Sequence, residues 1–580
     1  MKLKNQFAFI GLSIFLALWS CDDYEDYPIE QFTIDYVFST TDSLGVNAKA
    51  YLDAIYATMY NGHNRIGGDY LDAATDDALS SSLTESSVQR LFSGRYTPTS
   101  LVGGEMDWAR YYAGIRKANT FINNIDVVPL MNTFKNNVED SIPLNRAWKA
   151  EARFLKAYFY FELVKRYGGV PIVRDTPYEL GDNVEIPRNT FEQCIHYITS
   201  ELDAIKDSLR SIPIANVNSD GHVVTQEAAM ALKCRVLLYA ASPLFNERPI
   251  EASNELVGYA NYDAERWKVA ADAARSFMNT YSNFALNMSF SGLFLNDYGV
   301  NNNKEIIFFR QGSKNTEIES RNGPVGFSGN NLGTGRTSPT QNLVDAFPMK
   351  DGKAINDPTS KYTYSLSNMY QNRDPRLDLT VLHNGSKWLN TTLETFKGGI
   401  HNPTGATQKT KTAYYLRKFM GNFENQANYT EQLHTWIMLR YAEVLLNFAE
   451  AQNEYAGPSD EVYQVIKNIR KRAKIEAGTN GMFGLKAGMT KEEMRAVIQN
   501  ERRLEFAFEE HRYWDIRRWR IAEDIFTQPV KGLSIIKDGG TLTFNVVNVA
   551  TSTFETKRYL YPIPYSEVVK NSNMIQNPNW

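Results

Sequence analysis

Segments with the apolar spacing of helices recur along this chain, and they constrain its fold more than any other feature. Residues 144–167 place Trp148, Leu155 and Val164 on one side, while lysine and arginine form only a narrow polar stripe. A Gly-Gly pair and a proline follow at once, where a helix ends most easily. This segment is therefore expected to be a helix that is buried over most of its surface.

Capping residues mark where other helices begin. Thr190 with Gln193, and Thr490 with Glu493, have the spacing of a capping box, in which two backbone donors are satisfied. Thr225 is expected to cap an alanine-rich helix that ends before a Ser-Pro pair. The small side chains of that helix would let a neighbouring helix approach closely.

Further helical patterns complete a series of helix pairs. We expect helices over residues 262–281, 436–450, 460–473 and 490–508. Trp436 and Leu439 are expected to lie on the apolar face of the second of these. Helix pairs that recur about four times favour a stacked array of the tetratricopeptide kind, although the sequence repeat is too degenerate to establish it.

Two long segments lack helical patterning. Residues 61–104 are rich in Gly, Ser, Thr and Asp, and residues 282–433 mix Asn, Gly and Pro with short apolar runs such as 305–309. Such stretches are typical of surface loops and short strands. Because binding residues often sit on loops held by a rigid scaffold, recognition is expected here.

The first twenty residues have the pattern of a secretory signal peptide. Two lysines precede an apolar run over residues 7–19, which is too short to span a bilayer. Leu18 and Ser20 before Cys21 fit a lipobox, so Cys21 is expected to become the lipidated first residue of the mature protein. The alternative is an ordinary signal peptide followed by an incidental cysteine.

The composition indicates an exported, folded protein that does not bind nucleic acid. The formal net charge is −4, and no basic run is present to attract phosphate groups. An aromatic content of 13% is enough for a large core and for surface platforms. Cys194 and Cys234 lie far apart in helical patterns, so they are expected to be small buried side chains rather than a disulfide.

These patterns divide the chain into three parts. They are a lipoprotein signal peptide (1–20), a lipidated N-terminus with an acidic tether (21–40) and a single body (41–580). Within the body, helix pairs are expected over about 41–281 and 434–522, a loop-rich insertion over 282–433 and a C-terminal loop region over 523–580.

Several motifs together resemble one protein family. They are residues 146–160 with Tyr167-Gly168-Gly169-Val170-Pro171, and residues 339–345, 373–377, 439–446, 500–519, 561–564 and 576–578. In this order they are similar to the SusD/RagB outer-membrane lipoproteins of the Bacteroidetes. Two positions depart from the family pattern. Cys234 replaces the usual alanine, and Glu510 replaces a glycine, which predicts that this helix junction needs no left-handed backbone.

The resemblance implies an all-α fold, namely a tetratricopeptide-like helix-pair scaffold whose loop-rich, short-strand insertions form the ligand face. It also implies a surface-exposed, glycan-binding lipoprotein that delivers oligosaccharides to a SusC-like TonB-dependent outer-membrane transporter and acts as its lid. Such a protein is expected to be lipid-anchored in the cell outer membrane, to face the extracellular side, and to lack catalysis and cofactors. The acidic run 22–26 then resembles an export signal, with a flexible tether as the alternative.

Two other functions fit the same framework. RagB-like members of the family capture peptides rather than glycans, and a purely structural surface scaffold would bind no soluble ligand. The sequence alone does not separate these alternatives.

A sugar site needs exposed aromatic planes surrounded by polar groups. The resemblance places such groups before the first long helix of the body and in the middle insertion. In the first region the candidates are Tyr70, Asp72, Asp76, Asp77, Arg90, Tyr96 and Glu105. In the second region they are Arg321, Asn322, Phe327, Asn330, Asn331 and Trp388. Trp388 is expected to be exposed, whereas Trp108 is expected to belong to the core.

Catalytic and metal sites are weaker hypotheses. Charged residues recur at helical spacing at Glu501, Arg502, Glu505, Glu509 and Arg512. We interpret them as ion pairs that brace packed helices rather than as a catalytic cluster. The aspartates between residues 69 and 77 lack the spacing of a calcium loop, so a solvated loop is the preferred interpretation and no metal is expected. No familiar hydrolase motif accompanies the many carboxylates.

Overall fold

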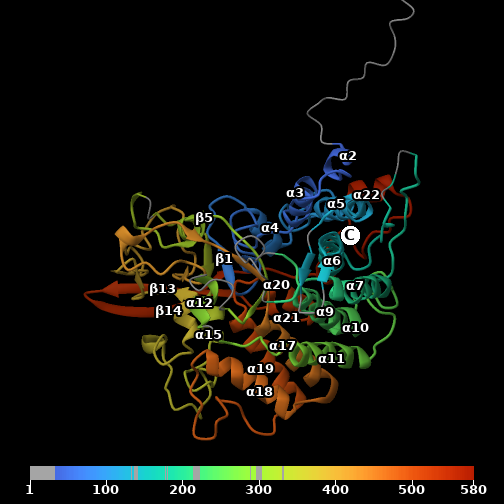
Figure 1. Cartoon of the computed structure of the whole chain (residues 1–580). Coiled ribbons are helices and arrows are strands. Elements are labelled where there is room, and N and C mark those ends of the chain that lie inside the picture. Colours follow the sequence, from blue (N-terminus) through green and yellow to red (C-terminus); the bar gives the residue numbers. More distant parts are fainter. Residues whose placement is uncertain are drawn as a thin grey trace, which may run out of the picture.

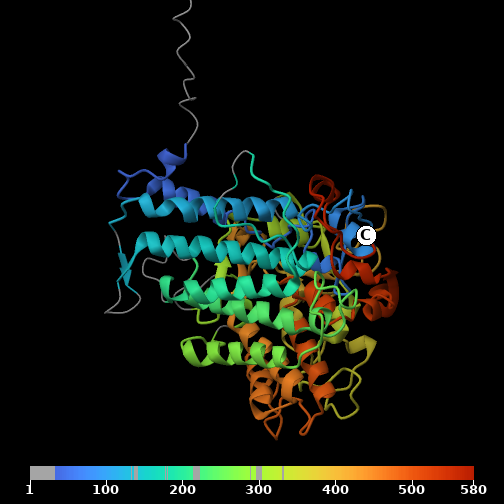
Figure 2. The same ribbon diagram turned by 90° about the vertical axis from the view of Figure 1, so that its right-hand side faces the viewer.

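A stack of long helices forms one half of the molecule (Figure 1). In chain order the helices are α3 (Val46–Tyr56), α5 (Trp108–Asn124), α6 (Leu144–Tyr167), α7 (Phe191–Ile205), α9 (Gln226–Ala241), α11 (Glu265–Thr280), α17 (Tyr441–Ala456), α18 (Asp460–Arg472) and α19 (Lys491–Glu505). Each packs against the next, except that α18 and α19 both pack on α17. Figure 2 shows the helices of the N-terminal half lying roughly parallel, one above another.

The computed structural model describes residues 33–131, 133–135, 141–176, 178, 181–212, 223–287, 289–295, 303–329 and 332–580. The predicted signal peptide, Cys21, the acidic run 22–26, Asn330 and Asn331 lie outside these residues.

Shorter helices and two-stranded sheets fill the rest of the described chain. The helices are α2 (Ile34–Val37), α4 (Ser87–Ser93), α10 (Pro243–Asn246), α12 (Phe290–Leu295), α14 (Glu317–Asn322), α15 (Gln341–Ala346), α16 (Arg376–Thr380), α20 (His511–Arg518), α21 (Ala522–Ile525) and α22 (Tyr565–Lys570). The antiparallel strand pairs are β1 (Ala78–Ser80) with β6 (Thr337–Pro339), β2 (Thr133–Lys135) with β3 (Ser141–Pro143), β4 (Ile306–Arg310) with β12 (Trp436–Arg440), β5 (Lys314–Asn315) with β11 (Gln432–Leu433), β7 (Val381–Leu382) with β10 (Tyr415–Leu416), β8 (Lys387–Trp388) with β9 (Thr391–Thr392), and β13 (Val530–Asp538) with β14 (Thr541–Ala550).

The predicted helix boundaries are largely confirmed, and so is the helical fold class. Helix α6 spans the predicted residues and ends at Gly168, which has a positive φ of 78°. Thr190 and Thr490 form the predicted capping boxes of α7 and α19, and the Thr225 hydroxyl accepts from the backbone N–H of Ala228. Cys194 and Cys234 are buried and unbonded to one another.

The prediction of a helix that includes Trp436 and Leu439 is wrong at its start. Residues Trp436–Arg440 form β12, which pairs with β4 through a register irregularity, and α17 begins only at Tyr441. All five residues of β12 are buried. A strand that is covered on both faces carries an unbroken apolar run, and such a run cannot be told from a buried helix by periodicity.

Two predictions about loop regions are also wrong. Residues 61–104 contain helix α4, and residues 69–82 are buried rather than on the surface. The C-terminal region contains the long hairpin β13–β14, which projects at the left of Figure 1. The sequence carries a signal for this hairpin that the prediction overlooked, because Leu542, Phe544 and Val546 alternate with polar residues after the pair Gly539-Gly540.

The turn between α19 and α20 is strained, and this contradicts the prediction for Glu510. Helix α19 ends at Glu505 rather than at Phe508, and both Phe508 and Glu510 have left-handed backbone, with φ of 63° and 64°. Such a conformation costs a non-glycine residue roughly 1–2 kcal/mol. Contacts offset the cost, because Arg65 Nη2 donates to Glu510 Oε2 at 2.9 Å and the Phe508 N–H donates to Asp72 Oδ1 at 2.9 Å.

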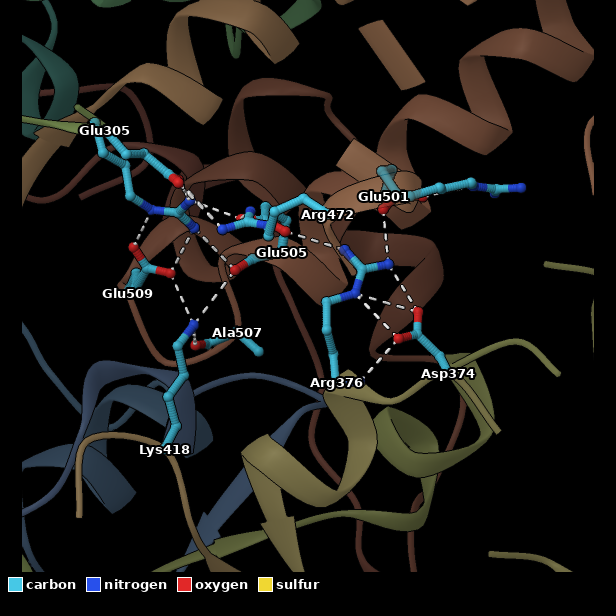
Figure 3. A network of polar contacts seen from close by, with 11 residues as sticks. Glu305, Asp374, Arg376, Lys418, Arg472, Glu501, Glu505, Ala507 and Glu509 are labelled. Carbon is cyan, nitrogen blue, oxygen red and sulfur yellow. Dashed lines mark hydrogen bonds and ion pairs between the residues drawn. The ribbon is translucent and has the colours of Figure 1, made fainter. Parts of the chain in front are cut away.

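A buried ion-pair network, which includes Glu305, Arg376 and Glu505, joins the middle insertion to the helical body (Figure 3). Arg440 at the end of β12 contacts Glu505 of α19 at 2.7 Å, Glu305 beside β4 at 2.9 Å and Glu509 at 2.8 Å. Arg376 of α16 contacts the other Glu505 oxygen at 3.0 Å. Burial would raise the pKa of Glu505, but the surrounding arginines hold it well below its usual range.

The network is balanced in charge. Its carboxylates belong to Glu305, Asp374, Glu501, Glu505 and Glu509, and its cations to Arg376, Lys418, Arg440, Arg470 and Arg472. These pairs confirm the interpretation of the helical charge pattern as bracing. Each charge meets a partner, which is the condition under which buried charges are tolerated.

The apolar core is continuous from the first described helices to the C-terminus. One cluster of buried side chains extends from Phe38 to Met574, and a smaller one joins α9, α11 and α17 around Trp267. Within the described residues, none of the helices has the length and apolar character needed to cross a membrane.

The protonation of Asp72, whose side chain accepts from the Phe508 N–H in the strained turn, can be tested. Burial and the neighbouring Asp77 raise the pKa of Asp72 to about 8, so the folded protein binds a proton that the unfolded chain releases near pH 4. The contribution of Asp72 to the free energy of unfolding is therefore fully present below about pH 4 and is lost as the pH rises toward 8. Asp72→Asn keeps the shape without the charge and is expected to add about 1–3 kcal/mol to the free energy of unfolding at pH 8.

Urea unfolding at pH 5 and pH 8 measures this difference. The two proteins should differ less at pH 5 than at pH 8, because the cost of keeping Asp72 protonated in the folded state begins near pH 4 and grows with each further pH unit up to about 8. If the free energy of unfolding changed equally with pH in the two proteins, the raised pKa of Asp72 would be contradicted.

Candidate functional site

The predicted aromatic platforms before α5 are buried. Tyr70 stacks on Phe419 with ring centroids 5.5 Å apart, and its hydroxyl lies 2.9 Å from His63 Nδ1. Tyr96 stacks on Trp580 at 5.4 Å. Trp108 belongs to the core, as predicted. In this structure Tyr70 and Tyr96 hold the loop to the body and present no ring face to solvent.

The predicted acidic binding residues are buried ion pairs. Asp76 Oδ2 lies 2.8 Å from Arg503 Nη2 and 2.9 Å from Arg512 Nη2, and Asp77 pairs with Arg503 as well. Burial opposes ionisation, yet the two guanidinium groups lower the pKa of Asp76 to about 2. Together with Asp72, these carboxylates fix the loop to α19 and α20.

The other polar candidates before α5 also serve the framework. Glu105 is buried between Arg65, at 2.6 Å, and Arg166, at 2.9 Å. Arg90 is partly exposed, but its Nη2 group donates to the carbonyl and hydroxyl of Ser100 at 2.9 and 2.7 Å. Arg90 therefore closes the short turn that follows α4.

In the middle insertion, the structure separates Arg321 from the other candidates. Asn322 is buried and donates to Asn64 Oδ1 at 2.8 Å, and Phe327 is buried against His401. Trp388 is 5% exposed, so the prediction that it is exposed is wrong. It packs edge-on against Phe423, with 5.9 Å between ring centroids. Arg321 is exposed and pairs with Glu317 at 2.8 Å.

A cleft of about 450 Å³ opens beside Arg321, and we name it the loop-face cleft. Its lining residues are Ser320, Arg321, Gly329, Leu332, Thr334, Arg336 and Gln408. Sequence reasoning identified only Arg321 among them. The others carry no local signal, because single serine, threonine and glutamine residues in a loop are common and their grouping depends on the fold.

The two sequence regions expected to carry recognition meet at this cleft. Strand β1, from the first region, pairs with β6, which follows Arg336. Arg336 Nε contacts buried Asp69 at 2.8 Å, and its Nη2 donates to the Gly67 carbonyl at 2.8 Å. Gly68 has a φ of 92°, and a Cβ there would come within 2.8 Å of the Arg321 guanidinium. The positive φ therefore favours glycine at this position, whereas the flexible end of the Arg321 side chain could move away from a Cβ.

The cleft is suited to a ligand with many hydroxyl groups. Guanidinium and amide N–H groups and hydroxyls supply donors and acceptors, while Leu332, 54% exposed, supplies an apolar contact. Asp69 and Glu317 offset the two arginine charges. The lining includes no aromatic side chain.

The aspartates considered for calcium have other partners. Asp69 pairs with Arg336, and Asp76 and Asp77 pair with arginines of α19 and α20. Across the residues that the structure describes, no three His, Cys, Asp or Glu side chains are grouped so that they could hold a metal ion.

Comparisons with known proteins agree with the predicted family. A model described as "SusD family" matches residues 304–580, and one described as "Starch-binding associating with outer membrane" matches residues 34–238. SusD-like protein P2 of Formosa agariphila is 23% identical over 593 residues, which cover 99% of each chain.

Two solved structures from Bacteroides fragilis share the fold. A SusD-like protein has a TM-score of 0.74 and 24% identity, covering 95% of this chain and all of its own. A SusD-like carbohydrate-binding protein has a TM-score of 0.69 and 22% identity, covering 92% of this chain and 99% of its own. The SusD family model over residues 304–580, a second, SusD-like model over residues 34–238 and the full-length likeness to SusD-like protein P2 together show that the chain belongs to the SusD/RagB family.

Proposed function

We propose that this protein captures oligosaccharides at the loop-face cleft and passes them to a SusC-like TonB-dependent transporter, over which it acts as a lid. The observation that carries the proposal is the cleft itself, where donors from Arg321, Arg336 and Gln408 gather beside an apolar side chain. Capture requires no bond to be broken, so the proposed role is binding without catalysis.

The comparisons support a glycan as the ligand. The matching N-terminal model is described as starch-binding and outer-membrane-associated, and one solved relative is described as carbohydrate-binding. The charge balance of the cleft points the same way, because paired arginines still donate hydrogen bonds but attract an anion only weakly. A neutral, hydroxyl-rich ligand matches such a lining.

The lipid anchor is part of the proposal. Cys21 would hold the protein at the outer face of the outer membrane, and the residues that follow it would leave the body room to move over the transporter. A RagB-type peptide ligand remains the alternative that the binding experiment must distinguish.

Glycan-array binding of the mature protein, followed by calorimetry with the best glycan, tests the ligand class. Arg321→Ala removes an exposed donor from the cleft and is expected to weaken binding about tenfold, or about 1.4 kcal/mol. Arg275→Ala is the matched control, because Arg275 is another partly exposed arginine in ion pairs but lies on α11. The affinity of Arg275→Ala for the glycan should equal that of the parent protein.

Two results would overturn the glycan assignment. One is equal affinity of Arg321→Ala and the parent protein for the array glycan. The other is the absence of glycan binding together with capture of peptides from a digest that Arg321→Ala abolishes, which would establish the peptide alternative.

Replacement of the lipid-attachment residue tests the anchor. Cys21→Ala should prevent acylation and move the protein from the membrane fraction to the soluble fraction, since acyl chains supply roughly 0.8 kcal/mol per buried methylene. Metabolic labelling with a fatty acid and cell fractionation measure both effects. Unchanged labelling and membrane association of Cys21→Ala would refute the anchor.

A further inference from the structure

A second cleft, of about 650 Å³, opens in the helical body, and we name it the helix-face cleft. It lies among α10, the loop before α11, α17 and α19, away from strand β1 of the loop-face cleft (Figure 1). Its volume falls within the range of roughly 300–1,000 Å³ that is usual for small-molecule sites. Of its lining residues, only Trp519 belongs to the motifs of the family resemblance, and the proposed function does not involve this cleft.

Three aromatic side chains line this cleft. Trp267 and Trp519 line it and are only 5% and 4% exposed. The Trp519 indole N–H donates to Glu450 Oε1 at 2.7 Å, which fixes the plane of the ring. Tyr262 lines the same cleft and is 54% exposed. The exposed ring of Tyr262 offers the apolar surface that the C–H face of a sugar ring requires, whereas the two tryptophans are as buried as Trp388 and belong to the packed wall of the cleft.

One wall is rigid and electrically balanced. Arg495 of α19 forms a fork with Glu454 of α17, with Nε–Oε1 and Nη2–Oε2 distances of 2.6 Å each. Because these charges satisfy one another, the wall neither attracts a strong anion nor repels a neutral ligand. Its geometry is fixed before a ligand arrives, which lowers the entropic cost of binding.

Three polar groups in the cleft form no side-chain hydrogen bond with another residue in the described part of the chain. They are the Gln499 amide, the Glu247 carboxylate and the Tyr262 hydroxyl. Partial burial and the carboxylates of Glu247 and Glu454 raise the pKa of Tyr262, so its hydroxyl remains a donor at physiological pH. An amide, a carboxylate and a phenol supply both donors and acceptors for sugar hydroxyls.

From these contacts we infer that the helix-face cleft is a second binding site, specific for neutral oligosaccharides. The lining carboxylates of Glu247, Glu450 and Glu454 are matched in number by the cations Arg248, Lys491 and Arg495, so no net charge favours an ionic ligand. A purely apolar ligand would leave the polar lining groups without partners. The site stands on its own lining residues, so it does not depend on the proposed role of the loop-face cleft.

The test uses the mature, full-length protein carrying Arg321→Ala, so that the loop-face cleft is weakened. Laminarihexaose, maltohexaose and cellohexaose are the probes, and saturation-transfer NMR with calorimetry gives the affinity for each. We expect at least one hexasaccharide to bind, and we expect Tyr262→Ala and Gln499→Ala each to weaken it about tenfold. Tyr262→Phe, which keeps the ring, should lose less than about threefold.

Tyr565→Ala is the matched control, because Tyr565 is 55% exposed on α22 and outside the cleft. It should leave the affinity unchanged. The inference is overturned if none of the three hexasaccharides binds more tightly than about 10 mM, or if Tyr262→Ala and Tyr565→Ala bind equally well. Loss of glycan binding in Arg321→Ala alone, with no residual Tyr262-dependent affinity, would support the loop-face cleft and refute the second site.

Discussion

The architecture of this protein depends on a buried ion-pair network centred on Arg440. The guanidinium of Arg440 joins the end of β12 to Glu305 beside β4 and to Glu505 of α19, and it therefore connects three distant segments. Desolvation makes such charges costly, and only complete pairing offsets the cost. Each carboxylate in the network has at least one arginine or lysine partner, which is why the insertion has a defined position on the helical body.

The same type of interaction holds the loop before α5. Asp76 and Asp77 pair with Arg503 and Arg512, while Asp72 fixes the strained turn at Phe508. Earlier in the same loop, Asp69 pairs with Arg336 and so fixes one side of the loop-face cleft. Asp69, which positions the cleft, is therefore buried, whereas lining residues such as Arg321 and Leu332 are exposed.

This division explains what the sequence could predict. Helices such as α6 and α7 were predicted accurately because periodicity and capping residues are local signals. The aspartates near residue 76 were predicted to bind ligand because their partners lie more than 400 positions away, and spacing carries no sign of such pairing. The predictions that Trp388 is exposed and that Tyr70 presents a ring to a ligand were wrong for the same reason, because the burial of a side chain depends on contacts made by other segments.

Glu510 shows a different limit. Because position 510 holds a glutamate rather than a glycine, we predicted no left-handed backbone there. The residue is nevertheless left-handed, and its ion pair with Arg65 stabilises that conformation. The helix-face cleft was not predicted at all, because its lining comes from four separate stretches of the chain. Local patterns thus predict the scaffold well, and the sites that the scaffold creates only in part.

Hydrogen exchange of Arg440→Met tests the central role of the network most directly. Removing one partner from a buried network costs about 3–5 kcal/mol, so amides of β4, β12 and the end of α19 should exchange much faster than in the parent protein. Lys268→Ala, which removes an exposed ion pair on α11, should leave the same amides protected. Equal protection in both variants would contradict the claim that this network holds the insertion on the helical body.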